Sequence, residues 1–191
     1  MIVLALDQST SATGWALGEP GSTPTCGTFV PPRSNDVDNY YPLASSSRDW
    51  LTKMLAENNV THLRFEQPLM PRAAVKWINK KPVAYVETNI QTLRKLYGLA
   101  WEIELVAGDA SIDCRETNIA TWRSWFIKGI TPKPKGTKAL KQAVMDRCND
   151  FGWYPKNDNE GDALGIWAHA GFLLTKHVPQ RGPGELFGGA S

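Results

Sequence analysis

The chain has 191 residues, of which 42% are hydrophobic and 21% charged, which is ordinary for a globular protein with one sizeable core. Its formal net charge of +2 gives no reason to expect nucleic-acid binding from overall charge, so any basic surface must be local. The three cysteines form no CxxC pair, which argues against a zinc site and fits a reducing, cytoplasmic setting. No apolar run approaches the length of a membrane span, and the N-terminus begins with a strand pattern rather than a signal peptide, so we expect no membrane contact.

The first sixteen residues predict a buried strand that ends in a carboxylate. Residues 2–6 are a continuous apolar run, which is typical of a strand covered on both faces, and Asp7 follows directly. Residues 8–11 are small and polar, and residues 13–16 begin a second strand pattern. A buried carboxylate is costly unless it is paired, and a metal ion is a common partner. The alternative is an Asp that merely forms a turn.

The next segments predict an antiparallel meander followed by a helix and a fourth strand. We expect the second strand at residues 14–17 and the third at 25–30, because the connecting turns are short. A helix is expected over residues 39–58, with an apolar face formed by Leu43, Trp50, Leu51, Met54 and Leu55. The fourth strand, residues 60–65, ends in Glu66, and ligands in open α/β sheets gather at such strand ends. A solvated strand-end residue is the alternative for Glu66.

The second half predicts further helices and one more strand. A long helix is expected over residues 82–101, with Pro82 in its first turn, and a fifth strand over residues 102–106. A short helix is expected over residues 118–128, and Thr137 is a candidate N-cap for a helix over residues 138–149. The prediction is an α/β fold with a five-stranded mixed sheet, three antiparallel strands and then parallel ones, flanked by helices. It forms one domain over residues 1–175, and residues 176–191, rich in Gly and Pro, are expected to be a flexible tail.

Residues 121–141 are the one local charge anomaly, because they carry six cations and no acid. A basic, extended loop beside a helix start suits a phosphate backbone, although most charge runs are solvated surface. The candidate DNA-binding residues of this stretch are Arg123, Lys128, Lys133, Lys135, Lys138 and Lys141.

Carboxylates also cluster where the last helix is expected to begin, near residue 159. Asp162 lies in the first turns of this apolar helix, and Asp158 is four residues earlier, so both can face one side. An acid near a helix N-terminus is favourable by itself, which explains Asp158 and Glu160 better than Asp162. Asp7, Glu66, Asp158 and Asp162 are therefore candidate ligands for a hard cation, and their neighbouring basic stretch suggests metal-dependent phosphodiester chemistry.

Three motifs in order resemble the RuvC-type Holliday junction resolvases. They are Asp-Gln-Ser-Thr-Ser-Ala-Thr-Gly-Trp-Ala at 7–16, Phe-Glu-Gln-Pro at 65–68, and Asn-Glu-Gly-Asp-Ala-Leu-Gly-Ile at 159–166, whose usual form ends in Asp-Ala-Leu-Ala. The resemblance spans residues 1–170. It implies an RNase H-like fold, a homodimer acting on four-way junction DNA, and a requirement for Mg²⁺ or, as a substitute, Mn²⁺. Metal-dependent phosphodiester chemistry suggests two such ions per active site. The short chain is similar to bacteriophage or prophage members, which implies the cytoplasm of a bacterial or phage-infected cell.

The resemblance also implies roles for single residues. Asp7, Glu66 and Asp162 fall on catalytic, metal-binding acids of the family. The family's fourth acid or histidine lies three residues before the last Asp, where this chain has Asn159, and Asp158 is the expected substitute, with Glu160 behind it. Lys138 falls where the family keeps a catalytic basic residue, and Arg123 is a less secure match to another. Leu69 and Met70 lie where related enzymes place a side chain that opens the junction core, and Arg72 beside them is a further DNA-binding candidate.

The acids are shared by related activities, so the sequence leaves alternatives open. The chain is expected to be a crossover junction endodeoxyribonuclease. An RNase H-like nuclease acting on other branched DNA or on RNA–DNA hybrids is one alternative. A junction-binding protein without cleavage is another, although a pure binder has no use for clustered carboxylates that repel phosphates.

Overall fold

The computed structural model describes residues 1–32, 39–68, 73–78, 81–86 and 89–179. Its strands are β1 (Val3–Asp7), β2 (Thr13–Gly18), β3 (Thr25–Phe29), β4 (His62–Glu66), β5 (Ala73–Ile78), β6 (Lys81–Val86) and β7 (Asp113–Thr117). Its helices are α1 (Tyr41–Glu57), α2 (Ile90–Asp109), α3 (Ile119–Phe126), α4 (Thr137–Asp150) and α5 (Asp158–Thr175). Among the described residues, no helix is long and apolar enough to cross a membrane.

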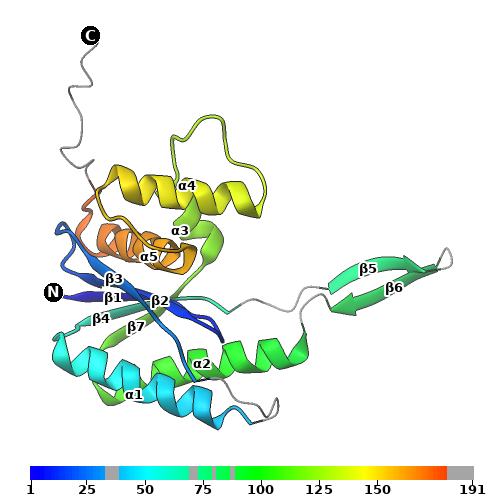
Figure 1. Ribbon diagram of the computed structural model, residues 1–191, viewed down its shortest axis with the longest axis horizontal. Helices are drawn as coiled ribbons and strands as arrows, with labels where there is room; N and C mark the ends of the chain where they lie inside the picture. Colours follow the sequence, from blue (N-terminus) through cyan, green and yellow to red (C-terminus); the bar gives the residue numbers. More distant parts are fainter. Residues whose placement is uncertain (33–38, 69–72, 79–80, 87–88, 180–191) are drawn as a thin grey trace.

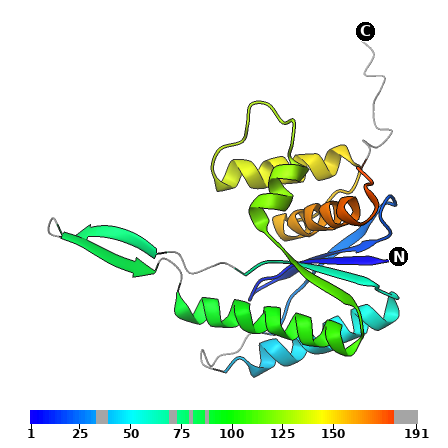
Figure 2. The same cartoon turned by 180° about the vertical axis from the view of Figure 1, so that it is seen from behind.

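The centre of the molecule is a five-stranded mixed sheet in the order β3-β2-β1-β4-β7. β1, β2 and β3 pair antiparallel, whereas β4 pairs parallel with β1 and with β7. Helices α3, α4 and α5 cover one face of the sheet, and α1 and α2 cover the other (Figures 1 and 2). The predicted sheet of three antiparallel strands followed by parallel ones, flanked by helices, is confirmed.

The apolar run of β1 supplies both halves of the core. Val3 and Ala5 belong to the cluster that includes α3, α4 and α5, while Leu4 and Leu6 belong to the cluster that includes α1 and α2. Each of these four side chains is at most 1% exposed. A strand buried on both faces needs a continuous apolar sequence rather than an alternating one, and this is why β1 was predictable.

Helix α5 is the central element of the second layer and packs on β1 and β2. Twelve of its residues, from Glu160 to Gly171, are buried, which leaves hardly any polar face. Its N-cap is Asn157, whose side-chain oxygen accepts a hydrogen bond from the backbone N–H of Glu160. This cap fixes where α5 begins, and therefore where its acids lie relative to the sheet.

The segment after β4 differs from the sequence prediction. A long helix was expected to begin at Pro82, but residues 81–86 form β6, which pairs with β5 in a two-stranded hairpin. Figures 1 and 2 show this hairpin projecting away from the body of the molecule beyond the N-terminal end of α2. The helix begins at Ile90, after the N-cap Asn89, whose side chain accepts from the N–H of Gln91. The prediction of a helix from Pro82 was wrong because proline also occurs in edge strands, where its missing N–H is tolerated.

The predicted fifth strand at residues 102–106 is also wrong, because these residues lie inside α2. Ile103, Val106 and Ala107 continue the buried side of this helix, at helical spacing after Leu99 and Ala100. The fifth strand is β7, at the edge of the sheet, and its pattern is mostly exposed. A polar edge strand has no apolar run for sequence analysis to detect.

The remaining predicted elements are confirmed, with one cap corrected. Helices α1, α3 and α4 and strands β2, β3 and β4 lie within a few residues of their predicted bounds. Leu43, Leu51 and Leu55 are buried on α1 as expected. Thr137 is not the N-cap of α4: the helix begins at Thr137, and its N-cap is Gly136, with φ of 81°.

Candidate active site

Asp7 lies at the end of β1, directly opposite Gly14 of β2. Gly14 has no room for a side chain, because a Cβ there would lie 2.0 Å from the backbone oxygen of Asn159. The missing side chain lets the first turn of α5 approach the end of β1. The motif glycine therefore has a structural purpose, which is to bring the acids of α5 to Asp7.

Glu66 lies at the same edge, because β4 runs parallel to β1 and also ends in an acid. The side chain of Gln8 donates a hydrogen bond to the backbone oxygen of Glu66 at 3.4 Å, which ties the two strand ends together. The indole N–H of Trp122 donates to Glu66 Oε2, also at 3.4 Å. Trp122 is fully buried, and it packs where a Cβ at Gly165 of α5 would come within 2.4 Å of its ring.

Asp162, in the second turn of α5, supplies the third carboxylate. It is only 6% exposed. Its Oδ2 accepts a hydrogen bond from Arg123 Nη2 at 2.8 Å, and this ion pair is largely buried. Its Oδ1 is buried and has no hydrogen-bond partner among the described residues. A buried carboxylate oxygen without a partner is energetically costly, so this atom marks a place where a donor or cation is favoured.

The three acids line one pocket of about 300 Å³ at the carboxyl ends of β1 and β4. The same pocket is lined by Arg123 of α3 and Lys141 of α4. Elements from both halves of the chain therefore meet here, with carboxylates at the sheet edge and cations from the helices above it.

The pKa values of all three acids are raised, mainly because these carboxylates are shielded from water. Burial raises the pKa of Asp7 well above its usual range, and the charges of Glu66 and Asp162 raise it further. Burial, followed by the charge of Asp162, raises the pKa of Glu66 to about 7. Burial also raises the pKa of Asp162, and the charge and hydrogen bond of Arg123 oppose this. Without a cation, the negative charge of this pocket is unfavourable.

Asp158, the expected fourth ligand, and Asn159, which occupies the family's fourth position, lie in different places. The carboxylate of Asp158 forms an ion pair with Lys141, which lowers the pKa of Asp158. Asn159 is among the residues that line the pocket, and its side chain donates to the backbone oxygen of Ala12 at 3.0 Å. Asp158 does not line the pocket itself, although its charge acts on Asp162.

Glu160 points away from the three acids. It is 4% exposed, and its carboxylate accepts hydrogen bonds from the hydroxyl of Thr28 at 2.9 Å and the backbone N–H of Lys156 at 2.8 Å. These contacts join β3 to the start of α5. Glu160 therefore stabilises the packing of β3 on α5 and does not line the pocket.

The predicted basic residues separate into two groups. Arg123 and Lys141 line the acidic pocket. The other four are exposed and do not line it: Lys128, Lys133 and Lys135 lie between α3 and α4, and Lys138 lies in the first turn of α4. The predicted DNA-binding residues Leu69, Met70 and Arg72 lie outside the described residues.

Sequence reasoning missed the ion pair between Arg123 and Asp162 and the contact between Trp122 and Glu66. Trp122 and Arg123 both belong to α3. No local sequence pattern shows where this short helix lies relative to the last helix. The one available sign was Gly165, which replaces the usual alanine of the resembling motif and leaves space for the Trp122 ring.

The donor atoms of the pocket are of the kind that bind a hard cation. All three acids offer carboxylate oxygens, the ligands that Mg²⁺ and Mn²⁺ prefer. In the described part of the chain, no group of three or more His, Cys, Asp or Glu side chains has the arrangement of a complete metal site. Arg123 holds one oxygen of Asp162 instead.

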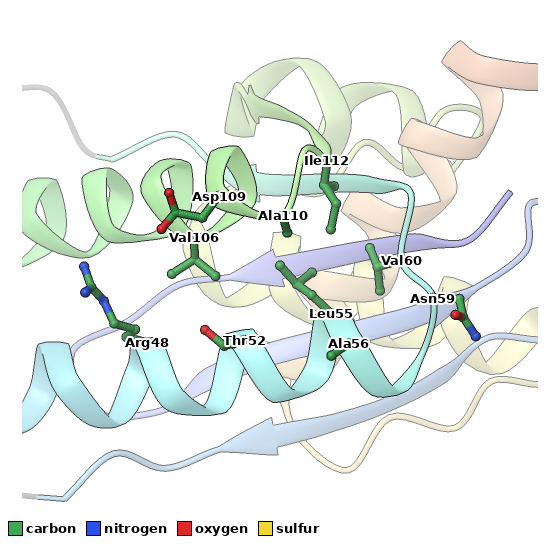
Figure 3. Close-up of a pocket in the computed structure, with 10 residues that line it drawn as sticks. All are labelled: Arg48, Thr52, Leu55, Ala56, Asn59, Val60, Val106, Asp109, Ala110 and Ile112. Atoms are coloured by element: carbon green, nitrogen blue, oxygen red, sulfur yellow. The ribbon is translucent and has the colours of Figure 1, made fainter.

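A second pocket lies between α1 and α2 and is chemically unlike the first (Figure 3). It has a volume of about 480 Å³, and its floor includes Leu55, Val60, Val106 and Ile112. Val60 and Ile112 precede β4 and β7, so this pocket is at the opposite end of the strands from Asp7 and Glu66. Asp109 is the one acid among its described lining residues, so it offers no cluster of carboxylates.

The structure is similar to solved structures of RuvC from Thermus thermophilus, one of which is in complex with a Holliday junction substrate. Each match has a TM-score of 0.62 and 11% sequence identity, and covers 94% of this chain and 99% of the other. Comparison of the sequence with protein-family models and with curated proteins finds no match. The chain therefore has the RNase H-like fold of RuvC, at a sequence identity at which the likeness shows the fold alone.

Proposed function

We propose that the chain is a metal-dependent, structure-selective DNA endonuclease that resolves four-way junctions by paired phosphodiester hydrolysis. The observation that supports this function best is the convergence of Asp7, Glu66 and Asp162 on one pocket that also contains Arg123 and Lys141. Acids arranged at strand ends beside cations suit the hydrolysis of a phosphodiester. The RuvC-like fold adds support, since one of the similar structures is bound to a Holliday junction.

Asp7, Glu66 and Asp162 are the proposed ligands of divalent cations, with Asp158 as the fourth and Mg²⁺, or Mn²⁺ in its place, as the ion. Two ions are proposed for each active site. When bound, they supply Lewis-acid chemistry for activating water and stabilising the leaving oxygen. Two observations support the assignment: Oδ1 of Asp162 has no hydrogen-bond partner among the described residues, and the pKa of Asp7 is raised. A cation would relieve both.

The cations of the chain are proposed to hold the phosphodiester. Arg123 and Lys141 line the pocket, which supports a role for them in contacting the scissile phosphate and stabilising the charge that develops on it. Lys138 is proposed to act on the same charge from the first turn of α4. The exposed Lys128, Lys133 and Lys135 are proposed to contact the DNA backbone without reading its sequence.

A homodimer is proposed because paired nicks on opposite strands require two active sites. The candidate interface is one side of α2, where four large apolar residues are exposed at helical spacing: Ile90 (68%), Tyr97 (41%), Trp101 (68%) and Leu105 (45%). Such an exposed apolar stripe is typical of an interaction surface. If two subunits packed with their α2 helices at a two-fold axis, each subunit would cover the stripe of the other.

The function is tested by offering synthetic four-way junctions, flaps, Y-forms and RNA–DNA hybrids side by side in Mg²⁺. The proposal predicts that the four-way junction is cleaved fastest, with symmetrical nicks on opposite strands. Faster cleavage of the hybrid would instead favour a related RNase H-like nuclease. Tight junction binding without cleavage in Mg²⁺ or Mn²⁺ would favour a binding protein.

A further inference from the structure

A third pocket, of about 650 Å³, lies between α3, α4 and the residues that connect them. Its apolar wall includes Ile127, Ile130 and Leu140. The connecting segment, which Figures 1 and 2 show as a loop between α3 and α4, is anchored at one point by Arg147. The Nη2 of Arg147 donates a hydrogen bond to the backbone oxygen of Lys128 at 2.8 Å. Ile127 is 8% exposed and belongs to the core, so part of this wall is fixed by the fold.

The charges around this apolar pocket are all positive. Arg123, Lys128 and Lys133 line it, and its described lining residues include no acid. An occupant that fits both properties has an apolar body and carries negative charge. A nucleotide has this chemistry, because its base presents a broad apolar face and its phosphate is anionic.

The pocket adjoins the acidic pocket described above. Ile119 and Arg123 line both of them. The guanidinium of Arg123 hydrogen-bonds to Asp162 on one side, and its Cζ lies 4.9 Å from the centre of the Trp122 ring. Its Nε is buried and has no hydrogen-bond partner among the described residues. Arg123 therefore lies in the wall that the two pockets share.

We propose that this pocket receives the unstacked base of a nucleotide beside the scissile phosphate. The inference rests on the proposed function and deepens it, because it assigns a site for recognising the substrate. Nucleotides at the crossover of a junction are less constrained by stacking than those in a duplex, so one base leaves the stack at lower cost. Arg123 is then the residue that links base placement to the position of the phosphate.

The test fills the pocket from the surface. Ala120 lines it and is exposed on α3, so Ala120→Leu and Ala120→Trp occupy the space in two steps with little effect on the core. Ala139→Trp is the matched control, because Ala139 is exposed on α4 and is not among the residues that line the pocket. Melting temperatures of all variants check that the fold is retained.

The binding measurement uses the nick-deficient variant Asp7→Asn and four-way junctions that carry 2-aminopurine at one crossover position at a time. We expect fluorescence to rise on binding at one position, as that base unstacks. Adding Ala120→Trp should abolish this rise, Ala120→Leu should reduce it, and Ala139→Trp should leave it intact. No rise at any position, or a rise that Ala120→Trp does not change, would overturn the proposal.

The kinetic measurement uses enzyme with intact Asp7 and a junction that lacks the base identified by fluorescence. Removing the base should slow single-turnover nicking by the wild type about tenfold. Ala120→Trp should already nick the intact junction slowly, and removing the base should have little further effect on its rate. Equal rates on both junctions would contradict the base pocket while leaving junction cleavage established. Absence of all nicking would contradict the nuclease function, and the fluorescence result would still decide the pocket. A free 2-aminopurine nucleotide that binds without DNA and loses binding in Ala120→Trp would assign the pocket to a free nucleotide instead.

Discussion

Asp158 and Asn159 differ in charge and in partners, which makes them separable by single substitutions. Asp158 carries a charge that acts on Asp162 and holds Lys141, whereas Asn159 donates one hydrogen bond to the Ala12 backbone. We predict that Asp158→Asn lowers metal-dependent cleavage more than Asn159→Ala does. Single-turnover nicking at several Mg²⁺ concentrations measures the difference.

The contrary outcome has a clear structural meaning. If Asp158 only contributes to the helix start, Asp158→Asn should cost no more than about 1 kcal/mol of stability and leave turnover intact. A larger loss in Asn159→Ala would assign the fourth position to the residue that lines the pocket.

Glu66 gives the metal-free protein a distinctive dependence on pH. Its pKa is raised from 4.5 to about 7 in the folded chain, so between these values the folded state binds more protons than the unfolded state. Stability must therefore fall as pH rises through this window. We predict that the melting temperature in chelator decreases from about pH 4.5 to about pH 7 and that Glu66→Gln makes this decrease smaller. If the melting temperature of Glu66→Gln depended on pH as that of the wild type does, the raised pKa of Glu66 would be contradicted.

At the scale of elements, the contact between Gly165 and Trp122 is a testable part of the site. A Cβ at residue 165 would come within 2.4 Å of the buried Trp122 ring, which also holds Glu66. Gly165→Ala should therefore destabilise the protein by about 1–3 kcal/mol, as overpacked cores do, and should slow cleavage. Chemical denaturation and single-turnover nicking measure the two effects.

Gly98 is the matched control, because it lies inside α2 and a Cβ there would meet nothing within 4 Å. Gly98→Ala should stabilise the chain by about 1 kcal/mol through helix propensity alone. Equal effects of the two substitutions would contradict the packing described for Gly165.

The sequence predicted elements whose pattern reflects their own burial and missed those that depend on partners. β1 was predictable because both of its faces are covered, and α1 because Leu43, Leu51 and Leu55 repeat at helical spacing. β7 was missed because a polar edge strand is specified by its neighbour β4. The β5–β6 hairpin was missed because each strand is specified by its pairing with the other.

The candidate site was predictable to a similar extent. Asp7, Glu66 and Asp162 follow from strand ends and an apolar helix, and the fold does bring them to one pocket. The contacts of these acids with basic side chains could not be predicted, because the position of α3 at the carboxyl ends of β1 and β4 depends on long-range packing. The pairing of Arg123 with Asp162 is a property of the folded chain only.

At the scale of the whole molecule, the exposed stripe of α2 predicts self-association. Trp101→Glu places a charge in the centre of the proposed interface, at a side chain that is 68% exposed and can be replaced without disturbing the core. We expect the wild type to be a dimer at micromolar concentration by light scattering and Trp101→Glu to be a monomer. The monomer should nick only one strand of each junction.

Leu173→Glu is the control for this substitution, because Leu173 is a 54% exposed residue of α5, on the other face of the sheet. It should remain dimeric. A wild-type monomer that still makes paired nicks would contradict the dimer, as would a Trp101→Glu variant that dimerises normally.

Asp7 is proposed to belong to a metal-dependent nuclease centre. The most direct measurement is nicking of a labelled four-way junction in Mg²⁺ by the wild type, Asp7→Asn and the control Asp49→Asn, whose exposed residue lies on α1. We predict symmetrical nicks by the wild type and by Asp49→Asn, and a loss of orders of magnitude in Asp7→Asn with junction binding retained or strengthened, because removing a negative charge favours phosphate. Cleavage by Asp7→Asn at a rate near that of the wild type would show that Asp7 is not part of the nuclease centre.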